Sequence, residues 1–322
     1  MGQYIFLTGL YLPKPGATGM CIHQLAKECA KRGKDVTTIC YADGDDRKTF
    51  DGVKIQKIHV PFFYQEIMSS NKIKRCINRL FSLGSKMLHI WNYPLRSKML
   101  VNRYCKAIEM TIIQNNKATI VASVNPIEAV IAAGKMKQKY SDKIRIVYYC
   151  ADTLSNEKGK SGLLSEKYRT KCGNKWEKKL FSMFDKVLIM ECHRKHYYTE
   201  EYQQFIPKMH IVNFPLLTKP EINIKTVKDG KIRFVYAGTL YKELRNPSYL
   251  CEILVQLSSV MPIEVIFIGS GDCDDILDEA CQRAKGAIKR LGFPVDIYSY
   301  IFDGAIGLSV LPMLNNMSAL PK

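Results

Sequence analysis

Residues 4–42, YIFLTGLYLPKPGATGMCIHQLAKECAKRGKDVTTICYA, decide the fold. The opening apolar run, residues 4–7, is typical of a strand that is covered on both faces. A turn with two prolines and two glycines follows, and apolar residues then recur at helical spacing as far as Gly33. Residues 36–40 favour a second strand. The stretch therefore predicts two parallel strands joined by a helix in a right-handed crossover.

Gly16 and Gly19 stand where this predicted helix begins. The first amides of a helix lack intrahelical partners, so a glycine turn at this place suits a phosphate or another anion. Alternatively, the glycines only make the turn. The dinucleotide fingerprint is incomplete because Lys14 replaces its first glycine, although Asp43 could mimic the acid that binds ribose. A nicotinamide-dependent enzyme is therefore a weaker alternative.

The rest of the chain continues to alternate strands with helices. In the first part, strands are expected at 53–60, 118–124, 144–149, 186–190 and 209–212, and helices at 95–114, 127–140, 165–184 and 194–205. In the second part, strands are expected at 232–237, 263–268, 289–293 and 305–311, with helices through 257 and from about 274. This alternation predicts doubly wound parallel sheets.

The length of 322 residues allows about two domains. Residues 219–230 are polar, contain Pro220 and show no strong period, so the domain boundary is expected there. We therefore predict a Rossmann-like α/β domain over residues 1–218 and a second, incomplete one over residues 219–322.

The net charge of +18 is concentrated in the first part of the chain, because residues 219–322 hold as many acidic as basic side chains. Residues 67–108 contain no acidic residue, and their lysines and arginines alternate with apolar residues and Trp91. This pattern favours an anionic membrane surface as a partner; the alternative is a solvated basic face. Nucleic acid is not expected, because no zinc finger, RNA-binding aromatic motif or helix-turn-helix is recognisable.

The sequence contains no apolar run of the roughly 18 residues that a spanning helix needs, and no signal peptide is expected. Its eleven cysteines are scattered without a C-x-x-C motif, which is typical of reduced cytosolic thiols. Cys192, His193 and His196 lie close in sequence, but no second ligand cluster accompanies them. No metal site is expected, and these residues favour a surface helix.

Several segments together resemble the GT-B glycosyltransferases, especially the family 4 group that builds bacterial surface polysaccharides. The likeness lies in residues 15–19 with 30–36, in residues 234–240 with Arg245-Asn246-Pro247, and in residues 266–271. It covers almost the whole chain, and the order and spacing of the motifs make it more specific than any single motif.

The resemblance implies that the second domain holds a nucleotide-sugar donor, with no cofactor and no metal. Glycines would let the backbone approach the diphosphate, and a guanidinium would pair with its oxygens. This set comprises Gly16, Gly19, Gly238, Thr239, Arg245, Gly269 and Gly271. Thr239 departs from the family pattern, which often has a basic residue at this position.

The resemblance further implies that the first domain holds the acceptor, a lipid-linked or other glycan. Asp152 follows the predicted strand at 144–149 and is the candidate base or acceptor-orienting residue. The alternative role for Asp152 is a helix N-cap or turn residue. A cytoplasmic location is expected, peripheral on the inner face of the cell membrane.

The sequence departs from the family pattern at its end. Residues 308–322 resemble the approach to the donor-site helix, and the carboxylates that usually hold the donor sugar would follow Lys322. We therefore expect a C-terminally truncated hexosyltransferase-like chain with weak or no transfer by itself. The alternative is a non-catalytic relative that binds membrane or glycan.

Overall fold

The computed structural model describes residues 2–11, 16–41, 47–60, 84, 87, 90–112, 117–155, 164–213, 215, 229–242, 245–269, 271–292 and 306–308. The chain divides into two compact units, Met1–Lys219 and Pro220–Lys322. The predicted boundary between residues 218 and 219 lies outside the described residues. Each unit has its own hydrophobic core.

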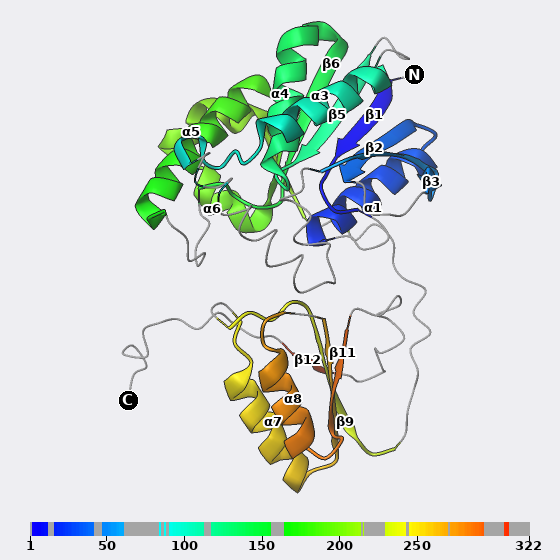
Figure 1. The fold of residues 1–322 in the computed structure, drawn as a ribbon, viewed down its shortest axis with the longest axis vertical. Coiled ribbons are helices and arrows are strands. Elements are labelled where there is room, and N and C mark those ends of the chain that lie inside the picture. Colours follow the sequence, from blue (N-terminus) through cyan, green and yellow to red (C-terminus); the bar gives the residue numbers. More distant parts are fainter. Residues whose placement is uncertain are drawn as a thin grey trace. The chain divides into compact units, whose positions relative to one another are not determined.

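The first unit is built on a sheet in the order β3-β4-β2-β1-β5-β6-β7-β8 (Figure 1). All neighbouring strands are parallel except β3 and β4. The strands are β1 (Gln3–Leu7), β2 (Asp35–Tyr41), β3 (Thr49–Phe50), β4 (Val53–Ile58), β5 (Ala118–Ser123), β6 (Ile144–Cys150), β7 (Lys186–Met190) and β8 (Met209–Val212). The order reverses beside β1, which confirms the doubly wound prediction.

Helices cover both faces of this sheet. They are α1 (Ala17–Lys31), α3 (Lys98–Ile112), α4 (Ile127–Tyr140), α5 (Glu166–Met183) and the short α6 (Arg194–Tyr197). Phe6 packs with Ile22 and Ala26 of α1, whereas Ile5 and Leu7 belong to the larger core that includes α3 and α4. Because side chains alternate along a strand, the apolar run of β1 serves both cores.

The second unit has a parallel sheet in the order β11-β10-β9-β12 (Figure 1). Its strands are β9 (Ile232–Ala237), β10 (Ile263–Ile268), β11 (Ile288–Leu291) and β12 (Ile306–Gly307), and its helices are α7 (Ser248–Val260) and α8 (Asp274–Arg283). The order again reverses, beside β9. The second unit is therefore also Rossmann-like, as predicted.

The predicted helix over residues 194–205 is wrong. Helix α6 ends at Tyr197, Thr199 is extended, and a 3-10 helix follows over Glu200–Lys208. Tyr197 and Tyr202 both donate hydrogen bonds to the carboxylate of Glu177. In a continuous helix, two residues five positions apart point about 140° away from each other. The break therefore lets both hydroxyls reach one buried acceptor.

A short hairpin formed by β3 and β4 was not predicted. Asp51 and Gly52 link these strands with φ angles of 48° and 77°. An Asp-Gly pair with both φ angles positive is typical of a tight hairpin turn. The sequence signal was present, but the neighbouring strand at 53–60 alone was predicted.

Candidate functional site

The carboxyl ends of β1, β5 and β6 lie next to one another in the first unit. The amide of Gly9, after β1, donates to the carbonyl of Asn125, after β5, at 3.1 Å. Strand β6 pairs with β5 on the side away from β1. In open α/β sheets, ligands bind beside the carboxyl ends where the strand order reverses. This edge is the candidate ligand-binding edge of the first unit.

The structure places both predicted glycines of the first unit at the start of α1. Gly16 is the exposed N-cap residue, and Gly19 is buried in the first turn. The first turn holds no acidic residue. A Cβ atom added at Gly16 would meet no atom within 4 Å. Gly16 is thus not required by packing against the described residues.

A partly buried polar cluster contacts the middle of α1, and no motif in the sequence predicts it. Tyr11 OH lies 2.7 Å from His23 Nδ1, and His23 Nε2 lies 3.2 Å from Asp51 Oδ2. Lys27 Nζ lies 2.7 Å from the same oxygen. Burial lowers the pKa of His23, although Asp51 opposes this effect. The hydrogen bond from Lys27 keeps the pKa of Asp51 below its usual value.

Asp152 lies two residues beyond β6, at the carboxyl edge, and it is exposed. Its backbone oxygen lies 3.3 Å from Cys150 Sγ, and the preceding carbonyl, of Ala151, accepts from His193 Nε2 at 2.9 Å. No described residue bonds to the Asp152 carboxylate. Asp152 is also separated from the start of α5 by more than ten residues, so it does not cap that helix. The structure thus excludes a role as N-cap of α5, whereas the alternative role as a turn residue stays open, because Asp152 lies in a bend of the chain.

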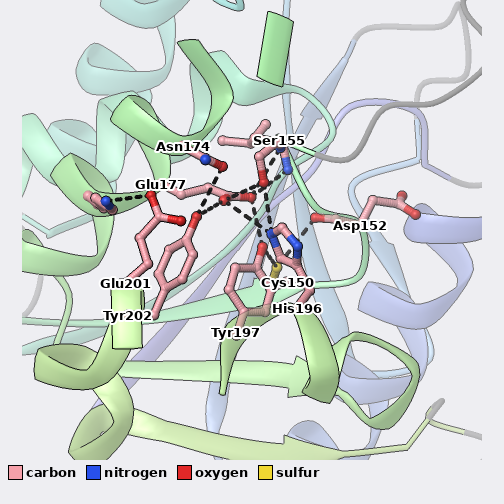
Figure 2. Close-up of polar contacts among 11 residues, drawn as sticks. Cys150, Asp152, Ser155, Asn174, Glu177, His196, Tyr197, Glu201 and Tyr202 are labelled. Carbon is pink, nitrogen blue, oxygen red and sulfur yellow. Dashed lines mark hydrogen bonds and ion pairs between the residues drawn. The ribbon is translucent and has the colours of Figure 1, made fainter. Parts of the chain in front are cut away.

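Glu177 of α5 lies at the centre of a buried network behind this loop (Figure 2). Its Oε1 atom accepts from the amide of Leu154 at 2.7 Å and from the amide of Ser155 at 3.3 Å. Tyr197 OH donates to Oε1 at 2.8 Å. Ser155 Oγ and Tyr202 OH donate to Oε2 at 2.8 Å and 2.6 Å.

Burial raises the pKa of Glu177, but hydrogen bonds from His196, Tyr202, Tyr197 and Ser155 outweigh it, so the pKa lies below its usual value. Sequence reasoning missed this residue because its partners lie about twenty positions away on either side. The sequence offered no local signal for such a network.

Two of the three residues that suggested a metal have other partners. His193 bonds to Ala151 O, and His196 Nε2 lies 2.8 Å from Ser155 Oγ, whereas Cys192 is exposed. Among the described residues, no group of three His, Cys, Asp or Glu side chains could hold a metal ion.

In the second unit, packing explains two of the predicted donor glycines. A Cβ atom on Gly269, whose φ is 144°, would overlap the carbonyl oxygen of Gly238, and one on Gly271 would overlap that of Leu240. The amide of Gly238 bonds to Ile268 O at 2.9 Å. Close approach of the two loops after β9 and β10 therefore requires these glycines whether or not a ligand binds.

The two helix starts at this edge differ in charge. Helix α8 begins with Asp274 and Asp275, and Asp274 forms a 2.8 Å ion pair with Arg290. These carboxylates already satisfy the positive end of the helix dipole and would repel a phosphate. Helix α7 has no acidic residue in its first turn. Of the two, α7 offers the better anion site.

Arg245 lies three residues before α7 and is exposed, and no described residue pairs with its guanidinium. Asn246 Oδ1 accepts from the amide of Ser248 at 2.9 Å and so fixes the start of the helix. Thr239 is half-buried in the loop after β9, and its carbonyl oxygen accepts from Tyr236 OH at 3.4 Å. The structure thus brings Arg245 near the better anion site in its own unit.

Half of the basic apolar stretch, residues 67–83, 85–86 and 88–89, lies outside the described residues. Its described part includes Trp91, which is 86% exposed, and the exposed Met99 of α3; the exposed Met110 follows on the same helix. Arg103 and Lys106 lie between these methionines on the same helix. No helix in the described part of the chain is long and apolar enough to cross a membrane.

No protein-family model and no curated protein sequence matches the chain. Solved structures do match. The catalytic domain of starch synthase IV from Arabidopsis thaliana, bound to ADP and acarbose, gives a TM-score of 0.57 at 11% identity, over 95% of this chain and 77% of that chain. S. aureus MnaA, in a structure with UDP, gives 0.54 at 10% identity, over 93% and 70%.

The N-terminal domain of trehalose-6-phosphate phosphatase from Candida albicans also matches, with a TM-score of 0.52 at 12% identity, over 93% of this chain and 74% of that chain. Identities this low establish the fold and no activity, since one fold hosts many functions. With its two Rossmann-like units, the chain has the GT-B fold.

Proposed function

We propose that the protein is a glycosyltransferase that moves a hexosyl group from a nucleotide sugar to a glycan acceptor. The likeness to domains bound to ADP and UDP supports a nucleotide donor. The observation that carries the proposal is the exposed Arg245 before α7, a helix start without acidic residues at the carboxyl edge of the second sheet.

On the donor side, Arg245 and the first amides of α7 neutralise the diphosphate, so transfer needs no metal and no cofactor. A guanidinium pairs well with phosphate oxygens, and helix amides add a fixed positive end. Gly16, at the start of α1, lets the backbone of the first unit approach an anion. Gly238 and Thr239 form the loop beside the diphosphate.

On the acceptor side, Asp152 orients the acceptor hydroxyl and takes its proton. The hydroxyl oxygen bonds to the anomeric carbon of the donor, the bond from that carbon to the diphosphate breaks, and the electron pair leaves with the nucleoside diphosphate. The acceptor is a lipid-linked glycan of surface polysaccharide synthesis. The basic apolar stretch, which includes the exposed Trp91, holds the protein to the inner face of the cytoplasmic membrane.

Calorimetric titration with UDP, ADP and GDP tests the donor side. At least one nucleotide is expected to bind, and Arg245→Ala is expected to weaken it about 10- to 100-fold, the value of one charge-assisted hydrogen bond. Lys231→Ala is the matched control, because it removes an exposed cation just before β9, at the opposite edge of the same sheet. Equal losses in both variants would contradict the role of Arg245.

Sedimentation with anionic and neutral vesicles tests the membrane side in the same preparation. Binding to anionic vesicles that weakens with salt is expected. Vesicle binding without binding of any nucleotide would contradict the enzyme proposal. It would favour the alternative, a non-catalytic relative that binds membrane or glycan. Failure to bind both would remove the two proposals together.

A further inference from the structure

The loop that carries Asp152, residues 151–155, is held by hydrogen bonds to its backbone. The carbonyl of Ala151 accepts from His193, and the amides of Leu154 and Ser155 donate to Glu177. These contacts come from two other elements, the 3-10 turn after β7 and helix α5. The loop is therefore fixed on both sides of Asp152.

Helix α5 lies unusually close to this loop. Gly173, one turn before Glu177, would place an added Cβ atom 2.5 Å from Leu154 O and 2.6 Å from Ser155 Cα. The missing side chain lets the helix approach until the Glu177 carboxylate reaches the two loop amides. Tyr202 is directed at the same carboxylate from the 3-10 helix Glu200–Lys208.

Figure 2 shows how Asp152 is oriented by these contacts. Its backbone carbonyl is directed toward Cys150, at 3.3 Å, while its carboxylate points away from the Glu177 network. The network reaches the loop through Leu154 and Ser155, and no described residue bonds to the Asp152 carboxylate. The arrangement fixes the loop and leaves the functional group exposed.

We infer that Glu177 is a positioning residue for transfer: it holds loop 151–155 in the conformation that presents the Asp152 carboxylate to the acceptor hydroxyl. The inference rests on the proposed function. A buried carboxylate has a large desolvation cost, and an apolar residue of similar size would fill the same space at lower cost. The charge of Glu177 is explained by its hydrogen bonds, because its carboxylate accepts from two backbone amides and three hydroxyls.

Glu177→Gln tests this inference with little change of shape. The Gln oxygen can still face Leu154 and Ser155, but the hydrogen bonds lose their charge and about half of their strength. Amide hydrogen exchange in the peptide with Leu154 and Ser155 is expected to rise about five- to tenfold, while exchange in β6 stays unchanged. Unchanged exchange in the loop of a folded variant would overturn the inference.

Turnover gives the second readout, as release of nucleoside diphosphate from UDP-glucose, UDP-N-acetylglucosamine, ADP-glucose and GDP-mannose with a glycan acceptor. For Glu177→Gln, kcat is expected to fall about tenfold or more while KM for the donor changes less than about twofold, because a misplaced base slows chemistry rather than donor binding. In Asp152→Asn, adding Glu177→Gln should cause little further loss. Full additivity of the two losses would overturn the positioning role.

Glu201→Gln is the matched control. Glu201 lies beside Tyr202, is half-exposed and pairs only with Lys178 among the described residues, at 2.6 Å. The variant is expected to leave both exchange and kcat unchanged. If Glu177→Gln does not fold, Tyr202→Phe keeps the ring and removes one hydrogen bond, and a smaller change in the same two readouts is expected; no change in either overturns the inference.

The two readouts separate the inference from the proposed function. If the unaltered protein binds no nucleotide and turns over none of the donors, the proposed function fails and with it the positioning role, even where exchange shows that Glu177 holds the loop. If it binds a nucleotide without measurable turnover, as the sequence predicts for this chain by itself, exchange in the loop alone decides the inference. If the protein turns over a donor and the loop loosens without a fall in kcat, the proposed function stands and the inference fails.

Discussion

At the scale of single residues, the reason for having glycine differs from one position to another in this chain. Gly173, Gly269 and Gly271 are required because neighbouring backbone atoms occupy the space of a side chain. Gly16 has no such neighbour within 4 Å. A glycine in a motif is therefore not by itself evidence of a ligand. Of these four positions, only Gly16 is free of a packing reason.

Gly173→Ala is expected to lower the free energy of unfolding by about 1–3 kcal/mol, because the backbone of Leu154 and Ser155 has to move. Gly134→Ala in α4 is the control. There the added Cβ atom meets the end of the Met183 side chain at 2.7 Å, and that flexible side chain can shift. Urea unfolding should show a change within about 1 kcal/mol for the control. Equal losses in both variants would contradict the packing argument.

Buried carboxylates are a second feature at this scale. Besides Glu177, Glu128 at the start of α4 accepts the amides of Arg96 and Ser97 at 2.9 Å and 3.0 Å. Both glutamates lie on helices with a mixed sequence, where an acidic residue usually faces solvent. Sequence alone could not distinguish them from surface glutamates, because their partners become neighbours only after the sheet has formed.

At the scale of elements, the unit β1-α1-β2 was predicted from its apolar pattern. The polar contacts that hold its helix were not predicted. Tyr11, His23 and Asp51 bring together the loop after β1, helix α1 and the β3-β4 hairpin. Each residue comes from a different element. The apolar pattern predicts the order of the strands and helices along the chain. The cluster shows how the loop, the helix and the hairpin contact one another.

The His23 cluster predicts a pH dependence of stability. Burial places the folded pKa of His23 below its usual value of 6.5, so the unfolded chain binds the proton more readily. Stability is therefore expected to fall as the pH falls from about 7.5 to about 5.5. His23→Gln should flatten this slope, as measured by urea unfolding at each pH.

The exposed His59 supplies the control, since His59→Gln should keep the slope of the unaltered protein. The pKa of Asp51 is lowered from 3.8, so its contribution is lost only at more acidic pH and does not enter this window. A slope that survives in His23→Gln would show that another group causes it.

At the scale of the whole molecule, the two units have separate hydrophobic cores, which predicts two unfolding events. Both tryptophans, Trp91 and Trp176, belong to the first unit, so fluorescence reports that unit alone, whereas far-UV circular dichroism reports both. The two probes are expected to give transitions that do not coincide in urea. Coincident transitions would show that the units unfold together.

Gly271→Ala makes this prediction specific. The added Cβ atom overlaps Leu240 O, so the second unit is expected to lose about 2 kcal/mol or more. The circular dichroism transition should move to lower urea while the fluorescence transition stays in place. Gly292→Ala, which meets no atom within 4 Å, should move neither. A shift in fluorescence with Gly271→Ala would mean that the units share stability.

By itself, the sequence determined the alternation of strands and helices, the two Rossmann-like units and the expected position of Asp152 after β6. Those features follow from local apolar periodicity and turn residues, which short segments carry. Only the tertiary structure decided that the helix over residues 194–205 is interrupted, that close packing of two loops requires Gly269 and Gly271, and that Glu177 is buried. Such features depend on atoms that lie far apart along the chain and meet at the carboxyl edge of a sheet.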